Sequence, residues 1–364
     1  MAQFTSKQQA GLSMVELMVA MTLGLLLTSA VLQIFINAKR TYELQQELSR
    51  IQENGRFAME FLTRSVRQGD YWGCLKSGSL SADNVFSTVA FPGGIEPFKG
   101  FYASNGVSSY DPPGDFPLPD LLTVRGGTEG GMPVIGTPGS SATASTLKVP
   151  GFEHQSGITI KDGDIVLVSD CERSSIFQVT DKNTAGANKS LGHHCSPTYS
   201  PGNTVVDPST GGCGASIKFT YGTDATLFNF GSTKYWIREG YDSGGNTRGV
   251  PVLVRGSDLD TNLSTGGTEL VEGIENMQLL LGYDTDNDGS VEYYAPPTAS
   301  LADMDKVIAV QISLVARSLR NNLLTETTAI DFNGLISASY SLPSTDRYLR
   351  KVFTTNVTLR NRLD

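Results

Sequence analysis

The chain has 364 residues, 39% of them apolar, so it is long enough for one large body or two lobes but too polar to cross a membrane many times. Its 37 acidic residues outnumber its 28 basic ones and give a net charge of −9, which argues against a general nucleic-acid-binding surface. The 39 glycines, with abundant Ser and Thr, indicate a loop-rich β protein rather than a helical enzyme.

An apolar segment begins directly after Gly11 and ends near Ile36. Its 25 residues, counted from Leu12, are enough to cross a hydrocarbon core of about 30 Å as a helix that rises 1.5 Å per residue. The segment contains one charge, Glu16. A carboxylate costs roughly 2.5–3.5 kcal/mol at the centre of a membrane helix and less near its end, and such residues are usually functional. We therefore predict one membrane span in which Glu16 has a role.

The arrangement of Gly11, Leu12 and Glu16 resembles the class III leader of type IV prepilins. In these proteins a membrane peptidase cuts after the Gly and methylates the new N-terminus, while the apolar helix stays attached. The resemblance implies that residues 1–11 are a cleaved leader and that Leu12, a position most often occupied by Phe, becomes the N-terminus. It also implies that Glu16 neutralises the Leu12 amine of an adjacent subunit.

An ordinary signal peptide or anchor is the main alternative for the N-terminal segment. A signal peptide has an apolar core of about 7–15 residues and a small-residue cleavage site, whereas this segment is longer and has no such site at its far end. The flanking charges count against the expected orientation, because Lys7 alone lies on the leader side and Lys39 and Arg40 follow the span. The cysteines described below support export of the body independently.

The helix is predicted to continue beyond the membrane, over residues 37–68. Nothing in the sequence breaks it before Gly69, so residues 12–70 form the helical region, spanning the membrane over 12–36 and amphipathic beyond. Gly55 costs about 1 kcal/mol in a helix relative to Ala, so we expect it to mark a close approach of helix and body. A plain anchor with a juxtamembrane coiled coil would show the same apolar stripe, which comprises Leu44, Leu48, Ile51, Gly55, Ala58 and Leu62.

The remaining residues, 71–364, are predicted to form a large β-rich body. Asp162-Gly163 favours a tight turn, which predicts a hairpin between strands at 158–160 and 165–168. Further strands are predicted at 175–180, 216–221, 233–238, 250–255, 277–283, 308–314 and around 353–359, with long loops at 126–146 and 192–214. The fold class is therefore α+β and type IV pilin-like, with a long N-terminal helix packed on an antiparallel β-rich body.

Four cysteines, Cys74, Cys171, Cys195 and Cys213, allow three pairings into two disulfides. An even number is typical of exported proteins. The sequence does not decide among the pairings. We favour Cys195 with Cys213, which closes a short loop, and Cys74 with Cys171, which would tie the end of the helix to the body.

Several segments resemble PilW-type minor pilins. These segments are 50–62, 70–74, 164–171, 252–255 and 352–361. The resemblance implies a minor pilin of the type IV pilus, active in assembly or initiation within a priming complex or at the pilus tip. It implies as partners other minor pilins, the major pilin, the prepilin peptidase, the assembly platform and a tip adhesin. It places the chain in the inner membrane as a single-pass protein with a periplasmic body, and in the surface pilus after assembly.

An acidic loop between two predicted strands has the pattern of a calcium site. Asp284, Asp286 and Asp288 alternate, Gly289 permits a sharp turn, and Ser290 would offer its carbonyl, as in the first half of an EF-hand. The twelfth position is Ala295, so the bidentate Glu is missing. Glu292 at the ninth position could contribute directly or through water, and Asp303 or Asp305 could complete the ligands. Asp, Asn and Gly also simply favour turns, but four carboxylates repel one another without a cation. We predict a structural Ca²⁺ ion here.

The sequence gives no indication of catalysis. It lacks Gly-x-Ser-x-Gly, Walker A and His-Glu-x-x-His motifs, and His193-His194-Cys195 is a poor tetrahedral zinc site because its members are adjacent. We therefore predict a non-enzymatic protein. Two alternatives to the minor pilin stay open: a J-type pseudopilin of type II secretion, and a membrane-anchored surface-binding module in which Glu16 has no special role.

Overall fold

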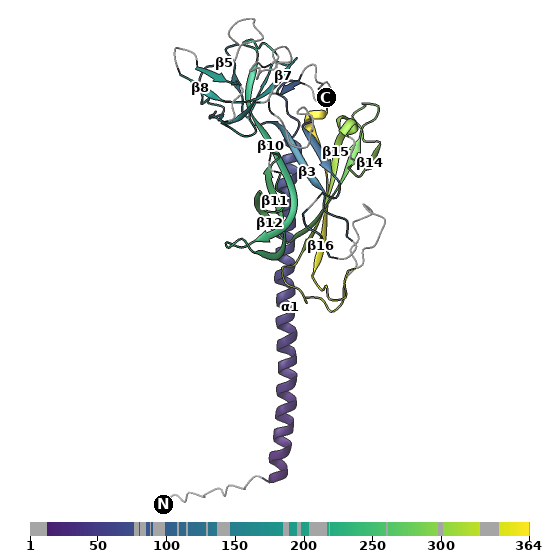
Figure 1. The fold of residues 1–364 in the computed structure, drawn as a ribbon. Helices are drawn as coiled ribbons and strands as arrows, with labels where there is room; N and C mark the ends of the chain where they lie inside the picture. The colour runs from purple at the N-terminus through teal and green to yellow at the C-terminus, as the bar shows by residue number, and fades with distance from the viewer. Residues whose placement is uncertain are drawn as a thin grey trace, which may run out of the picture. The chain divides into compact units, whose positions relative to one another are not determined.

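A computed structural model provides the fold of the chain (Figure 1). It divides into two compact units, residues 1–50 and 51–364. The boundary falls inside the long helix rather than after it. The structure describes residues 13–75, 80, 85–87, 89, 99–107, 109–113, 116–128, 130–136, 146–184, 189–194, 198–203, 217, 219–259, 261–297, 301–327 and 342–363.

One helix, α1, runs without interruption from Met14 to Gln68 over 55 residues. It contains no proline, and Gly24 and Gly55 are its two glycines. The helix ends where the amide of Gly69 donates to the carbonyl of Ser65 at 3.0 Å. The next residue, Asp70, adopts a left-handed conformation with φ of 61°, a common way for a helix to stop. The predicted long helix is confirmed, with its described start at Met14.

The C-terminal part of α1 belongs to the main core of the body. Ile51, Ala58, Leu62 and Val66 recur at helical spacing and are at most 1% exposed. Gly55 lies on the same face. A Cβ built there would lie 2.3 Å from a ring carbon of Phe353, so the absence of a side chain lets the ring pack directly on the helix backbone. The predicted close approach at Gly55 is thus found.

Replacing Gly55 by Ala should destabilise the body even though Ala is the better helix former by about 1 kcal/mol. The added methyl collides with Phe353, and overpacking of this kind typically costs about 1–3 kcal/mol. Chemical denaturation of the full-length protein in detergent would measure the loss. Adding Phe353→Leu should restore part of the stability. If Gly55→Ala alone is as stable as the wild type, the ring contact does not constrain this position.

Within the described residues the strands form three sheets. The largest follows the order β1 (Val85–Ser87), β7 (Ser174–Gln178), β6 (Ile165–Ser169), β10 (Thr226–Tyr241), β11 (Thr247–Ser257) and β12 (Thr268–Glu272), with β2 (Phe101–Ser104), β3 (Leu121–Gly127) and β4 (Met132–Pro133) joined beside this path. The second follows the order β14 (Tyr293–Ala295), β13 (Ile274–Tyr283), β15 (Val307–Arg317) and β16 (Arg350–Thr358). The third follows the order β5 (Thr146–Val149), β9 (Lys189–Gly192) and β8 (Asp181–Asn183).

Almost all of these strand pairs are antiparallel, and β1 with β7 is parallel. Strand β10 organises the largest sheet. Its first residues pair with β4 and β6, and its later residues pair with β3 and β11. Buried residues of β3, β10, β13 and β15 share a core with α1, while β6, β7 and β9 contribute to a second core. The predicted α+β fold, with an N-terminal helix packed on an antiparallel β-rich body, is confirmed.

Two local predictions are wrong. Residues 158–160 form no strand, and β6 instead makes its hairpin with β7. Asp162 and Gly163 do form a turn, and Gly163 needs its φ of 90°, but the turn leads into β6 from an irregular segment. The predicted strand at 216–221 is also absent at its described positions, 217 and 219–221, where Tyr221 is buried by packing from a loop. Buried apolar residues need not belong to strands, which explains both errors.

Candidate functional site

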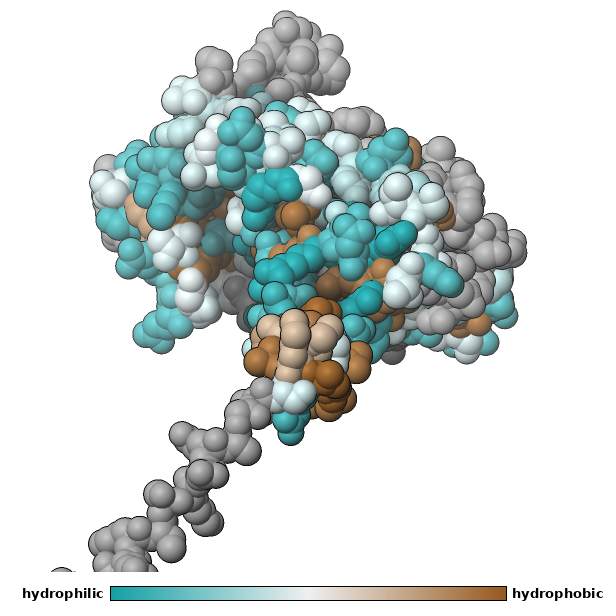
Figure 2. Space-filling model, turned by 90° about the horizontal axis from the view of Figure 1, so that it is seen from below, coloured by the Kyte–Doolittle hydropathy of each residue, from teal (hydrophilic) through white to brown (hydrophobic). Residues whose placement is uncertain are grey.

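The N-terminal part of α1 has the composition of a membrane-spanning segment. In length and apolar character α1 meets the requirements for crossing a bilayer, and none of its most apolar stretch is buried. Leu25 is 71% exposed and Phe35 is 65% exposed. Figure 2, a view from below, shows hydrophobic residues around this end of the helix. Exposure of so much apolar surface demands a partner, which can be lipid or other apolar helices.

Glu16 lies in the first turn of this segment and is exposed. The backbone amide of Ser13 lies 3.5 Å from Oε2 of Glu16. Ser followed three residues later by Glu is the pattern of a capping box, in which the carboxylate accepts from the amide of the capping residue. The sequence contains this signal, which the prediction above overlooked. The proposed processing residues, Gly11 and Leu12, lie outside the described residues.

The acidic loop connects β13 to β14 and brings the predicted carboxylates together. One carboxylate oxygen from each of Asp284, Asp286, Asp288 and Glu292 lies within 4.8 Å of the others, and this is the cluster of metal-binding side chains found among the described residues. Ligand atoms that share a Ca²⁺ ion at about 2.3–2.6 Å are separated by at most about 5 Å. The four-oxygen donor set therefore fits a hard cation.

Backbone amides of the acidic loop donate hydrogen bonds to its carboxylates and hold the loop in shape. Asp284, which is 5% exposed, accepts from the amides of Asp288 at 3.2 Å and Gly289 at 2.9 Å. Glu292 Oε2 accepts from the amide of Thr285 at 2.7 Å. Asn287 and Gly289 both have positive φ, 61° and 85°, which turn the chain back on itself.

The other predicted contributors to the acidic loop are placed differently. Ser290 donates its amide to Asp288 Oδ1 at 2.7 Å, and its side chain is exposed. Asp305 is bonded to the buried Lys99 and is not part of the cluster. The suggestion that Asp305 completes the ligands is therefore not supported by the geometry. The side chain of Asp303 lies outside the described residues.

Polar contacts fasten the end of α1 to the C-terminus of the chain. The carboxylate of Asp70 accepts from Trp72 Nε1 at 2.7 Å and from Nε of Arg362. Asn361 donates to the carbonyl of Gly69 at 2.7 Å. A disulfide joins Cys74 to Cys171, with the Cα atoms 4.6 Å apart, and this is the pairing favoured above for these two residues. Cys195 and Cys213 lie outside the described residues.

Asp120 is a buried carboxylate between a loop and β13. It is 1% exposed and accepts from the amides of Gly106 at 3.0 Å and Leu279 at 2.8 Å. Burial raises the pKa of Asp120 to about 7, although the two amide bonds oppose the shift. A carboxyl whose pKa is raised on folding stabilises the protein fully below its unfolded pKa near 4, and that contribution is lost as the pH rises to about 7.

The free energy of unfolding should therefore fall by roughly 2–3 kcal/mol between pH 5 and pH 8. Urea titrations of the full-length protein in detergent at both values would measure this difference. Asp120→Asn cannot ionise and should flatten the pH dependence, whatever it does to the absolute stability. A slope that persists in Asp120→Asn would assign the pH dependence to other groups.

Two parts of the chain match models of known protein families. Residues 234–361 match the family model for Type IV Pilus-assembly protein W, and residues 6–32 match the Prokaryotic N-terminal methylation motif. These matches confirm the resemblance inferred from the sequence: residues 6–32 are similar to a prepilin N-terminus and residues 234–361 to a PilW-type region. A type IV-like pilin from Thermus thermophilus aligns with 88% of this chain and 97% of its own, at 12% identity and a TM-score of 0.31. No curated protein sequence matches the chain.

Proposed function

We propose that the protein is a minor pilin that acts in assembly or initiation of a type IV pilus, in a priming complex or at the pilus tip. The observation that carries the proposal is the exposed apolar part of α1, with one carboxylate in its first turn, inside a match to the N-terminal methylation motif. The PilW-type match over residues 234–361 supports a pilus role over type II secretion. The function is structural rather than catalytic.

Assembly follows from the chemistry of the N-terminus. Prepilin peptidase cuts after Gly11 and methylates Leu12, which leaves α1 in the inner membrane with the body in the periplasm. Glu16 then neutralises the Leu12 amine of an adjacent pilin. An unpaired charge costs several kcal/mol out of water, so each of these two groups requires the other. Apolar helices bury against one another as the subunit leaves the bilayer, and the other minor pilins, the major pilin, the assembly platform and a tip adhesin are its partners.

A deletion strain tests the proposal. Surface pili would be counted by electron microscopy, with type II secretion assayed in the same cultures and the wild-type gene reintroduced as a control. We expect loss of pili with secretion intact. Normal pili with failed secretion would replace the proposal by a pseudopilin role. Normal pili with normal secretion would leave a membrane-anchored binding module.

We further propose that the acidic loop binds a structural Ca²⁺ ion. Asp284, Asp286, Asp288 and Glu292 would supply carboxylate oxygens, together with the carbonyl of Ser290. The ion, when bound, balances charges that otherwise repel and fixes the connection between β13 and β14. Tyr283 and Tyr293 flank the loop and stack on each other, with 5.1 Å between their ring centroids. This contact joins the two ends of the loop to the sheet. Affinity in the weak range of extracellular calcium modules is expected.

Calcium should raise the thermal stability of the full-length protein. With a dissociation constant of about 0.1–1 mM, 10 mM Ca²⁺ stabilises by roughly 1–3 kcal/mol. Asp286→Ala should abolish the calcium-dependent rise in melting temperature, whereas Asp224→Ala, an exposed acid outside the loop, should leave it unchanged. Equal calcium responses in both variants would exclude the loop as the site.

A further inference from the structure

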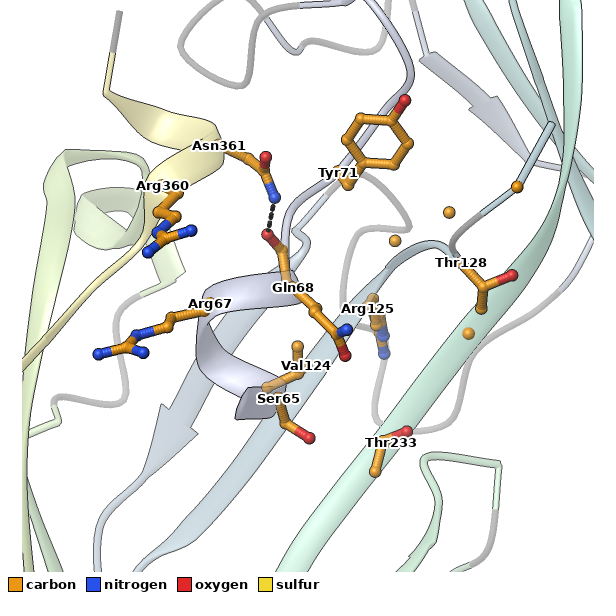
Figure 3. A pocket seen from close by; sticks show the side chains of 15 residues that line it. Ser65, Arg67, Gln68, Tyr71, Val124, Arg125, Thr128, Thr233, Arg360 and Asn361 are labelled. Carbon is orange, nitrogen blue, oxygen red and sulfur yellow. Dashed lines mark hydrogen bonds between the residues drawn. The ribbon is translucent and has the colours of Figure 1, made fainter. Parts of the chain in front are cut away.

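A groove lined by arginines runs beside the C-terminal end of α1. It consists of two adjoining hollows of about 680 and 710 Å³, which share Arg67, Gln68 and Arg360. Arg56 and Arg64 line the second hollow. In Figure 3, Arg67 of α1 and Arg360 of the short helix η4 (Arg360–Arg362) lie next to each other at one side of the first hollow. We call this feature, defined by Arg56, Arg64, Arg67 and Arg360, the arginine groove.

The positive charge of the arginine groove is not balanced within the described part of the chain. All four side chains are exposed, and none of them makes an ion pair there. Glu60 is the acidic residue among the lining residues of the two hollows, so the lining carries an excess of positive charge. The buried arginines behave differently, since Arg317 and Arg350 both pair with Glu275.

The groove is held in a fixed shape by the contacts at the end of α1. Asn361, next to Arg360, donates to the carbonyl of Gly69 at 2.7 Å, so the C-terminal turn is fastened to the helix that carries Arg67. Gly126 on β3 lines the first hollow with φ of 150°, and a Cβ there would lie 2.8 Å from the amide nitrogen of Tyr71. The guanidinium groups are therefore presented by a rigid base, which lowers the entropic cost of binding.

We infer that the arginine groove binds a carboxylate-rich segment of a neighbouring pilin-like subunit. Arginine presents a planar fork that bonds carboxylates in a bidentate manner, and four such groups along one hollow match an extended or helical acidic segment. Placing α1 and the C-terminal turn against an acidic neighbour would fix the orientation of the body within a fibre. The identity of the partner as a fibre subunit rests on the proposed function, but the chemistry of recognition does not.

Other anionic partners fit less well. Lipid headgroups are less suited, because the apolar segment ends near Ile36, twenty residues before Arg56 in the chain, and the other three arginines of the groove come later still. Nucleic acid binding usually requires a long basic surface, whereas this chain carries a net charge of −9 and the groove is bordered by Glu60.

Direct binding tests the inference. The full-length protein in detergent at 150 mM salt would be titrated with a fluorescent decaglutamate peptide. Arg67→Gln combined with Arg360→Gln should weaken binding by about tenfold or more. Arg255→Gln combined with Arg320→Gln removes two exposed arginines elsewhere and should leave the affinity unchanged. Absence of binding by the wild type, or equal loss in both double variants, would overturn the inference. A single-stranded 20-nucleotide DNA that binds more tightly than the peptide would overturn it in favour of nucleic acid.

Complementation in the deletion strain extends the test to the cell. Arg67→Glu combined with Arg360→Glu should accumulate and be processed like the wild type but fail to restore pili, whereas the corresponding Arg255→Glu, Arg320→Glu protein should restore them. Restoration by the groove variant would contradict the inference. If the deletion strain itself keeps its pili, the proposed function fails, and the peptide titration still decides whether the groove recognises carboxylates.

Discussion

The protein with Glu16→Ala should accumulate in cells and be cleaved by the prepilin peptidase, but it should fail to enter the fibre. In the proposed assembly, loss of the Glu16 carboxylate would leave the Leu12 amine of an adjacent subunit without a counter-charge in an apolar environment, and removing one partner of a buried ion pair typically costs about 3–5 kcal/mol. A penalty of that size corresponds to a reduction in incorporation of more than a hundredfold. The measurement is complementation of the deletion strain, with pili counted and the variant quantified in sheared pili and in membranes.

Glu16→Gln separates the two roles that the structure allows for this side chain. Gln can replace Glu in a capping box with Ser13, so it preserves the start of α1 while it removes the charge. If charge pairing drives assembly, Gln will fail as Ala does. Pili restored by Glu16→Gln but not by Glu16→Ala would show that the cap is sufficient and would remove the ion pair from the mechanism. Restoration by both variants would show that the Glu16 side chain is not needed for assembly.

Asp258→Asn should lower the free energy of unfolding of the body far more than a substitution at an exposed position. Asp258 is 1% exposed and bonds Arg125, whose side chain is fully buried, and the Tyr102 hydroxyl at 2.9 Å. Lys234 Nζ lies 3.4 Å from the same carboxylate. Neutralising Asp258 removes the carboxylate that these two buried cations share, and losing one member of a buried ion pair typically costs about 3–5 kcal/mol. Urea unfolding of the full-length protein would measure this loss.

The matched control for this prediction is Asp224→Asn, which makes the same chemical change at an exposed position. Its effect should stay within about 0.5 kcal/mol. A loss of less than 1 kcal/mol in Asp258→Asn would mean that water or a rearranged neighbour satisfies Arg125, and the carboxylate would not be the centre of this cluster. The double substitution Arg125→Met with Asp258→Leu should recover part of the stability, because it replaces both charges of the buried pair by apolar groups.

The elements with strong periodicity were predictable, and the reasons are local. Helix α1 can be predicted without knowledge of contacts between distant residues. Its apolar run indicates its length, and the apolar stripe from Ile51 to Leu62 indicates which face is buried. Strands β13 and β15 alternate clearly and were expected at 277–283 and 308–314. Strand β3 was missed because it includes buried Thr123 and Arg125, and a buried arginine makes sense only once Asp258, far away in sequence, is placed beside it.

The candidate site divides in the same way. The acidic loop was predictable because its carboxylates come from one short segment. The suggested contribution of Asp305 was wrong because Asp305 pairs with Lys99, a contact that sequence spacing does not reveal. The arginine groove could not be predicted from the sequence, because Arg67 and Arg360 lie almost three hundred residues apart in the chain and come together only in the folded protein. The basic residues of α1, which include Arg56, Arg64 and Arg67, could have indicated a positively charged helix face. Nothing in the sequence places Arg360 beside them.

The Cys74–Cys171 disulfide determines how tension would travel through the molecule. Cys74 lies six residues after the end of α1, and its partner Cys171 is 97 positions further along the chain, so the bond closes a long loop. A pull on α1 passes through this covalent bond to the turn between β6 and β7. The loop it closes contains β1 to β6, and these strands cannot add length to the chain while the bond is intact. A chain pulled by α1 could therefore extend only through residues outside the loop between Cys74 and Cys171, and reduction of this one bond would release the loop as well.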